Sequence, residues 1–492
     1  MISSIKLSAF GKNDIRGIYG DDVTEDLFYY VGKAYVKYVC ENTGKSVDEI
    51  WLSVARDARL HSEALSKSLI RGIVTTGANV VNIGLAPTPL GYYSEFSGID
   101  KDITNGAEID GALIITASHN PKEYNGLKMT FNKSSLDETE IKKVKALTEQ
   151  LLTQRELGVR HGMNKEFDLV SNYIEKMRNS FPNVGKGIKV VVDSANATGG
   201  IVAPELYRAI GCEVVELYSE PDGNFPNHHP NPSDEKTLTD LKNKVVEEKA
   251  DLGIAFDGDS DRIGVVDSQG VSMTGDKLLL IYALDVIDTL KRRGEVPKVV
   301  SEVKCSQVLY DTINKAGGEA IMCKTGHGYI KSKMKEVGAI LAGEMSGHTF
   351  FKDRYYGFDD AIYAGCRIIE IIAKKKQEEL NFRIESLLEP FNKVYTSQEV
   401  RYKCPNEMKK QVLSLLTERV MSNKKIFDKE YKEVNTLDGM RIIFDDGFAM
   451  IRQSNTEPVF TIRFEAGTKE MCEHYQNVML SELDKAMEES RA

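Results

Sequence analysis

The sequence has no run of apolar residues that could cross a membrane. No window of about 18 uncharged apolar residues occurs in it, and a spanning helix needs roughly that length. The N-terminus lacks the apolar core of a secretion signal, because Lys6, Lys12 and Asp14 soon interrupt any such run. We therefore expect a cytoplasmic protein with no membrane partner.

Cysteine is scarce, and an excess of positive charge is missing. The seven cysteines are scattered and form no CxxC pair, which favours reduced thiols over a disulfide framework. Lysine and arginine total 64 against 74 aspartates and glutamates, so the formal net charge is −10. This balance argues against nucleic acids and anionic membranes as partners. A few focused cations could still hold a small anionic ligand.

Two nucleotide-binding patterns are missing as well. Residues 44–46 resemble the end of a Walker loop, but Val39 stands where its first glycine must be. Gly326-His327-Gly328 continues to Lys331 where a dinucleotide fingerprint has glycine. ATP and NAD are therefore not implied.

The sequence contains three copies of one arrangement of strands and helices. Its 492 residues predict about three or four domains. In each copy a strand is followed by an amphipathic helix, a glycine that suits a helix end, and a second strand. The strands are expected at residues 50–57 and 80–83, 188–192 and 214–217, and 299–303 and 319–322, and the glycines are Gly77, Gly211 and Gly317. This alternation indicates a mainly α/β fold.

Each copy continues into a further apolar strand that opens onto a polar loop. The strands at 111–115, 252–256 and 339–343 lead into loops at 116–121, 257–262 and 344–348. Because ligands of α/β sheets bind beyond the carboxyl ends of strands, we expect the three loops to converge on one cleft.

The last hundred residues follow another pattern. Residues 441–444 and 448–451 flank an Asp-Asp-Gly turn and predict a hairpin. A polar loop at 452–458 leads to a strand at 459–464 and a terminal helix. We expect a separate, smaller α+β domain here.

Ser118 lies in the first polar loop, on a turn that Pro121 would constrain. A bare serine is a weak nucleophile, and no GxSxG elbow supports an acyl-transfer triad. Taken alone, a hydroxyl bonded to the backbone of the turn explains Ser118 better than catalysis does.

Three carboxylates alternate in the second loop, at Asp257, Asp259 and Asp261. This spacing directly after an apolar strand can wrap oxygens around a hard cation such as Mg²⁺. An EF-hand does not fit, because Arg262 occupies the position of its glycine. A solvated acidic turn is the plain alternative, and the apolar strand before the loop disfavours it.

The remaining two loops offer groups for a phosphorylated sugar. Glu344, Ser346 and His348 alternate around a glycine and suit sugar hydroxyls, although His348 could also be a structural histidine. The last loop gathers a guanidinium, hydroxyls and an amide that suit a phosphate; these are Arg452, Ser454, Asn455 and Thr456. A polar hairpin end is an equally good explanation of that loop alone.

Together, the four loops resemble the four signatures of the α-D-phosphohexomutase family, in the family's order and over essentially the whole chain. With Met345, the loop at 344–348 resembles that of the phosphomannomutase/phosphoglucomutase branch, since phosphoglucosamine mutases typically carry Gln at this position. The resemblance implies three related α/β domains in tandem plus a smaller, mobile C-terminal α+β domain around a central cleft. The domains would span residues 1–160, 161–271, 272–388 and 389–492.

The resemblance also implies roles for individual residues. Ser118 would carry the phosphoryl group and, with Asp257, Asp259 and Asp261, complete a Mg²⁺ site. Glu344 and Ser346 would read the sugar's hydroxyls, and Arg452, Ser454, Asn455 and Thr456 would hold its non-reacting phosphate. Further matching positions are Arg16, Lys128, Arg262, Lys304, Thr325, Gly326, His327 and the stretch 222–230. Two positions depart from the family pattern: Asn13 replaces a frequent tyrosine, and Ser260 a commoner glycine or alanine.

The implied reaction interconverts hexose 1-phosphate and hexose 6-phosphate, of mannose or glucose, through phosphoserine and a bound hexose 1,6-bisphosphate. Lys128 and His348 are the proton-transfer candidates, with His327 in reserve, and a lysine base would need a depressed pKa. The alternatives are a phosphoglucosamine mutase, a Ser/Mg-dependent sugar phosphatase and a non-catalytic phosphosugar-binding protein. A monomer is expected.

Overall fold

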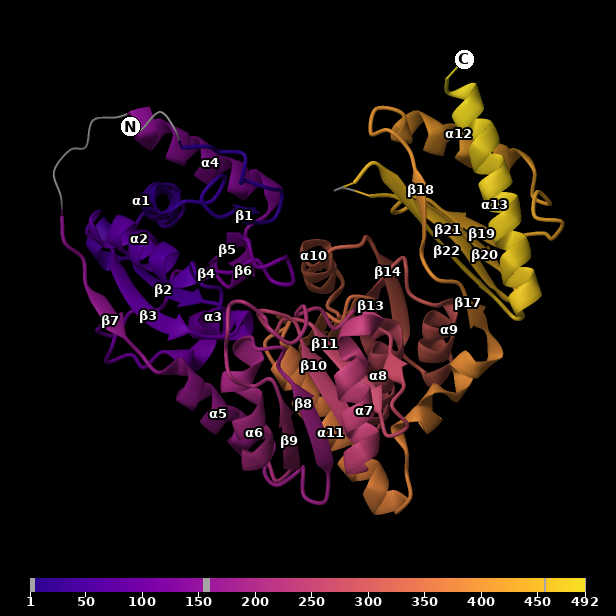
Figure 1. The fold of residues 1–492 in the computed structure, drawn as a ribbon, viewed down its shortest axis with the longest axis horizontal. Coiled ribbons are helices and arrows are strands. Elements are labelled where there is room, and N and C mark those ends of the chain that lie inside the picture. Colours follow the sequence, from indigo (N-terminus) through magenta and orange to yellow (C-terminus); the bar gives the residue numbers. More distant parts are fainter. Residues whose placement is uncertain (1–4, 154–159, 455–456, 492) are drawn as a thin grey trace. The chain divides into compact units, whose positions relative to one another are not determined.

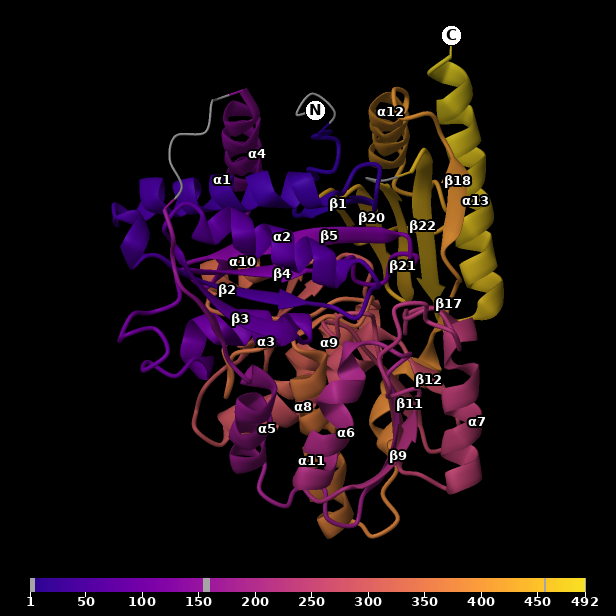
Figure 2. The same cartoon turned by 60° about the vertical axis from the view of Figure 1, so that its left-hand side comes forward.

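A computed structural model describes residues 5–153, 160–454 and 457–491 of the chain. It divides into two compact units. Figures 1 and 2 label the helices and strands of the chain. Unit 1 comprises residues 1–274 and 346–383, and unit 2 comprises residues 275–345 and 384–492. The expected third domain, 272–388, is thus shared between the two units. The units are described one at a time.

The first sheet of unit 1 has the order β1-β5-β4-β2-β3-β7, with β6 beside β5. Its central strand β2 runs parallel to both β3 and β4, whereas β5 is antiparallel to β4. The strands are β1 Ile15–Ile18, β2 Trp51–Arg56, β3 Asn79–Leu85, β4 Gly111–Ile115, β5 Tyr124–Phe131, β6 Ser134–Ser135 and β7 Asn164–Glu166. The helices are α1 Glu25–Thr43, η2 Val47–Glu49, α2 Ser62–Val74, α3 Thr88–Tyr93, η3 Ser94–Gly98 and α4 Glu138–Thr153.

The second sheet of unit 1 repeats this topology. The central strand β8 is parallel to β9 and β10, and β11 is antiparallel to β10. The strands are β8 Lys189–Asp193, β9 Glu213–Leu217, β10 Leu252–Phe256, β11 Ile263–Asp267 and β12 Ser272–Met273, and unit 1 also holds β16 Thr349–Phe351. The helices are α5 Leu169–Ser180, η4 Thr198–Ile201, α6 Ala203–Ala209, η5 Glu235–Leu238, α7 Thr239–Glu248 and α11 Ala361–Glu378.

Helix α11 comes late in the chain but packs into unit 1. Asp360 caps its first turn by accepting from the Tyr363 N–H at 2.9 Å. The Tyr173 hydroxyl of α5 donates to Asp360 at 2.7 Å, and the Tyr207 hydroxyl of α6 donates to Ile362 O at 3.1 Å. These buried contacts explain why residues 346–383 belong to unit 1.

Unit 2 holds the third copy of the layout, in which β13 is parallel to both β14 and β15. Its elements are α8 Gly275–Lys291, β13 Lys298–Glu302, α9 Gln307–Ala316, β14 Glu319–Cys323, α10 His327–Val337 and β15 Leu341–Gly343. The same unit contains an antiparallel sheet of order β17-β22-β21-β20-β19, with β18 beside β22. Its elements are η6 Ile384–Lys393, β17 Tyr395–Thr396, β18 Val400–Lys403, α12 Lys409–Ser422, β19 Glu433–Asn435, β20 Met440–Phe444, β21 Gly447–Gln453, β22 Val459–Ala466 and α13 Lys469–Glu489.

The threefold layout and the final hairpin predicted from sequence are confirmed. Two details differ. The α2 helix ends at Val74, with left-handed Gly77 three residues beyond it, because the Thr75 backbone turns without needing a glycine. Arg452 lies on β21 itself, because that strand stays paired to β22 through Gln453. Among the described residues, no helix has the length and apolarity that crossing a membrane requires.

Candidate active site

Ser118 lies on the turn after β4, in a buried and constrained position. Its backbone has a φ of +50°, a left-handed conformation that costs a non-glycine residue roughly 1–2 kcal/mol. Its N–H donates to Thr116 Oγ1 at 2.9 Å, and its Oγ donates to Asp257 Oδ2 at 2.8 Å. The turn therefore aims the hydroxyl at the acidic loop.

The acidic loop after β10 brings its three aspartates together, as predicted. One carboxylate oxygen from each of Asp257, Asp259 and Asp261 lies within 4.8 Å of the others, and all three residues are buried. Within the described residues, Oδ1 of Asp259 and Oδ1 of Asp261 have no hydrogen-bond partner. Burial and the two neighbouring carboxylates raise the pKa of Asp257 well above its usual value. Buried carboxylates with unused oxygens are the ligands that a hard divalent cation takes, so this cluster can bind a metal.

Two side chains, one on strand β5 and one on helix α3, hold the acidic loop in place. Lys128 of β5 forms ion pairs with Asp259 and Asp261, and the Thr88 hydroxyl donates to Asp259 Oδ2 at 2.6 Å. Burial opposes the charge of Lys128, but the two carboxylates outweigh it and raise its pKa well above the usual value. That direction is the opposite of what a lysine base needs.

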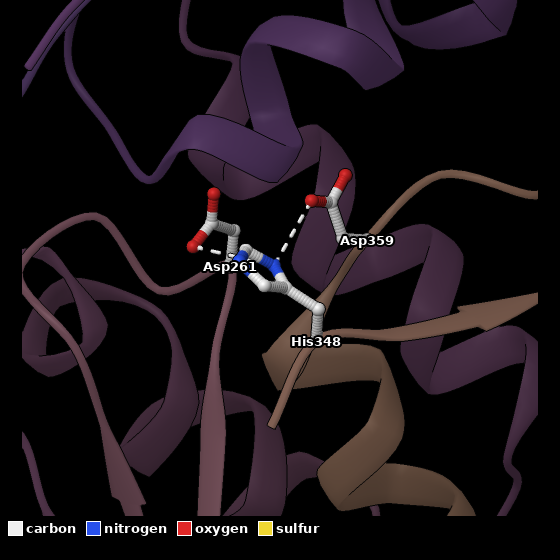
Figure 3. A group of neighbouring side chains, drawn as sticks. All are labelled: Asp261, His348 and Asp359. Carbon is white, nitrogen blue, oxygen red and sulfur yellow. Dashed lines mark ion pairs between the residues drawn. The ribbon is translucent and has the colours of Figure 1, made fainter. Parts of the chain in front are cut away.

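His348 lies beside the same loop, between Asp261 and Asp359 (Figure 3). Its Nδ1 is 3.1 Å from Asp359 Oδ2, while its Nε2 accepts from Arg262 Nε at 3.1 Å. The imidazole is thus held with a proton on Nδ1 and a lone pair on Nε2. Such a histidine can take up a proton at Nε2 once Arg262 moves aside.

Arg16 approaches the serine turn from β1. Its guanidinium donates to Asn120 Oδ1 at 2.9 Å and pairs with Asp14 at 2.5 Å. The neighbouring His119 is kept neutral, because burial, Arg262 and Arg16 lower its pKa to about 2. The structure therefore places the guanidinium groups of Arg16 and Arg262 in the surroundings of Ser118, where an anionic group would be stabilised.

In unit 2, Asp438 joins two of the predicted phosphosugar contacts. Its Oδ2 accepts from the Thr325 N–H at 3.0 Å and from Arg452 Nε at 3.2 Å. Glu344 Oε1 accepts from the Gly326 N–H at 2.8 Å, so the turn at 325–326 is held on both sides. His327 begins helix α10 directly after it.

The other residues predicted from the sequence make local contacts. Lys304 lies 3.5 Å from Glu302, and Ser454 accepts from the Glu457 N–H at 3.2 Å. Ser346 belongs to unit 1, where its carbonyl accepts from Ser233 at 3.0 Å. Asn455 and Thr456 lie outside the described residues.

Sequence reasoning missed several residues that contact the predicted ones. In unit 1, Thr88 contacts Asp259 and Asp359 contacts His348. In unit 2, Asp438 contacts Thr325 and Arg452. No local motif marks them. Arg59 was missed as well. It follows the end of strand β2, and that position could have marked it, because ligands of α/β sheets bind beyond the carboxyl ends of strands.

Comparison with known proteins places these loops in a family. Four profiles described as Phosphoglucomutase/phosphomannomutase match the chain in order: alpha/beta/alpha domain I at residues 7–155, domain II at 171–270, domain III at 274–391 and the C-terminal domain at 399–481. A phosphomannomutase/phosphoglucomutase of Pseudomonas aeruginosa is 37% identical over 99% of this chain and 97% of its own.

The chain belongs to the phosphoglucomutase/phosphomannomutase family.

Two further relatives agree with this. A phosphoglucomutase of Neisseria gonorrhoeae is 36% identical over 97% of this chain and 96% of its own. The crystal structure of a phosphoglucomutase/phosphomannomutase family protein from Burkholderia thailandensis superposes with a TM-score of 0.85, at 34% identity and 98% coverage of both chains. The four-domain α/β architecture expected from sequence is thereby confirmed as that of the phosphoglucomutase/phosphomannomutase family.

Proposed function

We propose that this protein is a phosphohexose mutase that interconverts hexose 1-phosphate and hexose 6-phosphate, of mannose and glucose, through phosphorylated Ser118 and a bound hexose 1,6-bisphosphate. The observation that carries the proposal is the 2.8 Å contact between Ser118 Oγ and Asp257, one of three clustered buried carboxylates, two of which have an oxygen without a hydrogen-bond partner within the described residues. A simple structural turn would need no such cluster beside its hydroxyl.

Phosphoryl transfer depends chiefly on positioning and on neutralising the charge of the transferred group. Arg16 and Arg262 would attract its equatorial oxygens, and Lys128 would keep the acidic loop in shape. His348 is the proposed base that takes the proton from the attacking sugar hydroxyl at Nε2. Glu344 and Ser346 are proposed to bind sugar hydroxyls, and the loop from Arg452 the non-reacting phosphate.

We propose Mg²⁺ as the ion of the acidic cluster, held by Asp257, Asp259, Asp261 and an oxygen of phosphorylated Ser118. All four donors are hard oxygens, as Mg²⁺ prefers. When bound, the ion supplies charge that polarises the transferred phosphoryl group.

Replacing Ser118 by Ala tests the central claim. The variant should fold normally but lose mutase turnover and accept no phosphoryl group from glucose 1,6-bisphosphate, because the acceptor oxygen is gone. Intact-protein mass and a glucose 1-phosphate assay measure both, and Ser180→Ala on the exposed end of α5 is the matched control. A Ser118→Ala enzyme that keeps the rate of the control would rule out the phosphoserine route.

Chelation tests the metal. Adding Mg²⁺ to EDTA-treated protein should stabilise it against unfolding, by about 2.7 kcal/mol at a hundredfold excess over Kd. Asp261→Asn should lose this stabilisation because one ligand is removed, whereas Asp288→Asn at the exposed end of α8 should keep it. Equal stabilisation of both variants would contradict a metal at the acidic loop.

Product analysis tests both the substrate and the reaction class. A mutase converts glucose 1-phosphate and mannose 1-phosphate to their 6-phosphates without releasing phosphate, whereas a phosphatase using the same serine releases it. Phosphorus NMR of the reaction distinguishes the two directly. We also propose a cytoplasmic monomer, and its seven free cysteines fit a reducing compartment.

A further inference from the structure

Arg59 is a buried arginine whose guanidinium hydrogen-bonds to backbone carbonyl groups of Ser118 and of the residues that follow it. It follows β2, is 2% exposed, and its Nε pairs with Asp57 at 3.1 Å. Its Nη1 donates to Pro121 O at 2.6 Å and Tyr124 O at 3.0 Å, and its Nη2 donates to Ser118 O at 2.9 Å and Asn120 O at 2.7 Å. An arginine has five N–H donors, and here all five have acceptors.

The turn needs this support. Ser118 has a left-handed backbone, and carbonyl groups buried without a donor destabilise a fold. One rigid guanidinium satisfies the carbonyl of Ser118 itself and those of three residues that follow it. Because the Ser118 carbonyl is fixed, the direction of its Cα–Cβ bond is fixed too, and with it the 2.8 Å contact to Asp257.

Residues 222–230 form the segment between β9 and η5, and they support Arg59. The segment matches the family but has no role in the proposed reaction. The Phe225 ring faces the guanidinium at 5.4 Å. Gly223 allows close approach, since a Cβ there would lie 2.5 Å from Leu60 N and 2.6 Å from Ala58 O.

We propose that Arg59 is a positioning residue for phosphoryl transfer: it latches the Ser118 turn in the strained conformation that aims Oγ at the metal cluster, and residues 222–230 brace the latch. This inference rests on the proposed function for its kinetic consequence but not for its structural one. Lysine cannot replace arginine here, because its single ammonium cannot span four carbonyl oxygens.

Arg59→Lys is the test, and Arg56→Lys is its matched control. Arg56 lies three residues earlier and is partly exposed, and its guanidinium lies 3.4 Å from the Asp57 carbonyl oxygen and 3.9 Å from a Glu63 carboxylate oxygen. We expect kcat of Arg59→Lys to fall about 10- to 100-fold, as misplacement of a reacting group does, with KM for glucose 1-phosphate little changed. Arg56→Lys should keep the wild-type kcat. A folded Arg59→Lys enzyme with the kcat of Arg56→Lys would overturn the proposal.

Hydrogen exchange separates the latch from the function. Amides of residues 118–124 should exchange faster in Arg59→Lys than in wild type or Arg56→Lys, whether or not the enzyme is a mutase. Faster exchange in a protein without mutase activity would sink the proposed function and leave the latch standing. Unchanged exchange would sink the latch.

Phe225→Leu covers the case in which Arg59→Lys fails to fold. It removes the ring that braces the guanidinium and leaves every hydrogen bond of Arg59 available. Faster exchange at residues 118–124, with a smaller loss of kcat than Arg59→Lys, is expected. Wild-type exchange and wild-type kcat in Phe225→Leu would refute the bracing role of residues 222–230 and with it the proposal.

Discussion

Single residues of unit 1 carry charge in places where water cannot reach, and each needs a local partner. Lys128 balances two aspartates, and Arg59 binds carbonyl groups. Glu95 is different, because it is 2% exposed and accepts hydrogen bonds from Thr130 Oγ1 and, at 2.9 Å, from the Lys133 N–H. Burial outweighs these hydrogen bonds and raises the pKa of Glu95 to about 7.

Glu95 should therefore make stability depend on pH. The folded protein keeps a proton that the unfolded chain releases from about pH 4.5 upward, so the stabilisation is complete below that pH. It is lost as pH rises through 7, by about 3 kcal/mol in total. Glu95→Gln should remove this loss and be more stable than wild type at pH 8 relative to pH 5. Urea unfolding at both values measures it, and parallel pH dependence of the two proteins would contradict the raised pKa.

Which residues could be foreseen depends on where their partners lie in the chain. Ser118 and the three aspartates each follow an apolar strand, and strand ends of an α/β sheet are where ligands bind, so a local pattern marks them. Thr88 and Asp438 act through contacts with residues far away in sequence, which only the folded chain defines. The protonation of Lys128 likewise depends on two carboxylates more than 130 positions along the chain.

At the scale of elements, strands and helices were predictable because their apolar periodicity is local. Strands β4 and β10 were foreseen to the residue, since each is an uninterrupted apolar run before a polar loop. Helix packing was not foreseeable in the same way. Helices α1 and α2 meet where Gly32 faces Leu69 O and Gly72 faces Tyr29 O, and neither glycine carries a signal of its partner.

Gly72→Ala should separate these two helices. A Cβ at residue 72 would lie 2.1 Å from Tyr29 O and 2.9 Å from Tyr29 C, which are backbone atoms that cannot rotate away. We expect a loss of about 1–3 kcal/mol in the free energy of unfolding, typical of overpacking. Gly328→Ala is the control, because no atom lies within 4 Å of its Cβ and alanine favours a helix. The expectation fails if Gly72→Ala is as stable as the control.

At the scale of the whole molecule, three domains repeat one layout and the fourth differs, whereas the compact bodies are two units. The boundaries expected at residues 160, 271 and 388 stay predictions, whereas α11 shows that packing does not follow the modules. In unit 2 the last sheet shares a core with the third repeat through Val303, Phe448 and Met450. Arg441 adds hydrogen bonds to Cys305 O at 2.9 Å and Gln307 Oε1 at 3.2 Å, and its guanidinium lies 3.7 Å from the Phe448 ring centroid. The fourth domain, which we expect to be mobile, therefore belongs to the same compact unit as the strands of the third repeat.

If the two units are separate cooperative bodies, the protein should unfold in two transitions that single variants move one at a time. Arg441→Met leaves buried acceptors of unit 2 without a donor, which costs roughly 1–3 kcal/mol for each, so it should lower one transition. Glu95→Gln at pH 8 should raise the other, because Glu95 lies in unit 1. Arg419→Met on the exposed face of α12 should move neither by much, since surface ion pairs contribute little. Calorimetry with the three variants assigns the transitions, and a single transition that responds to both Arg441→Met and Glu95→Gln would mean that all 492 residues unfold as one body.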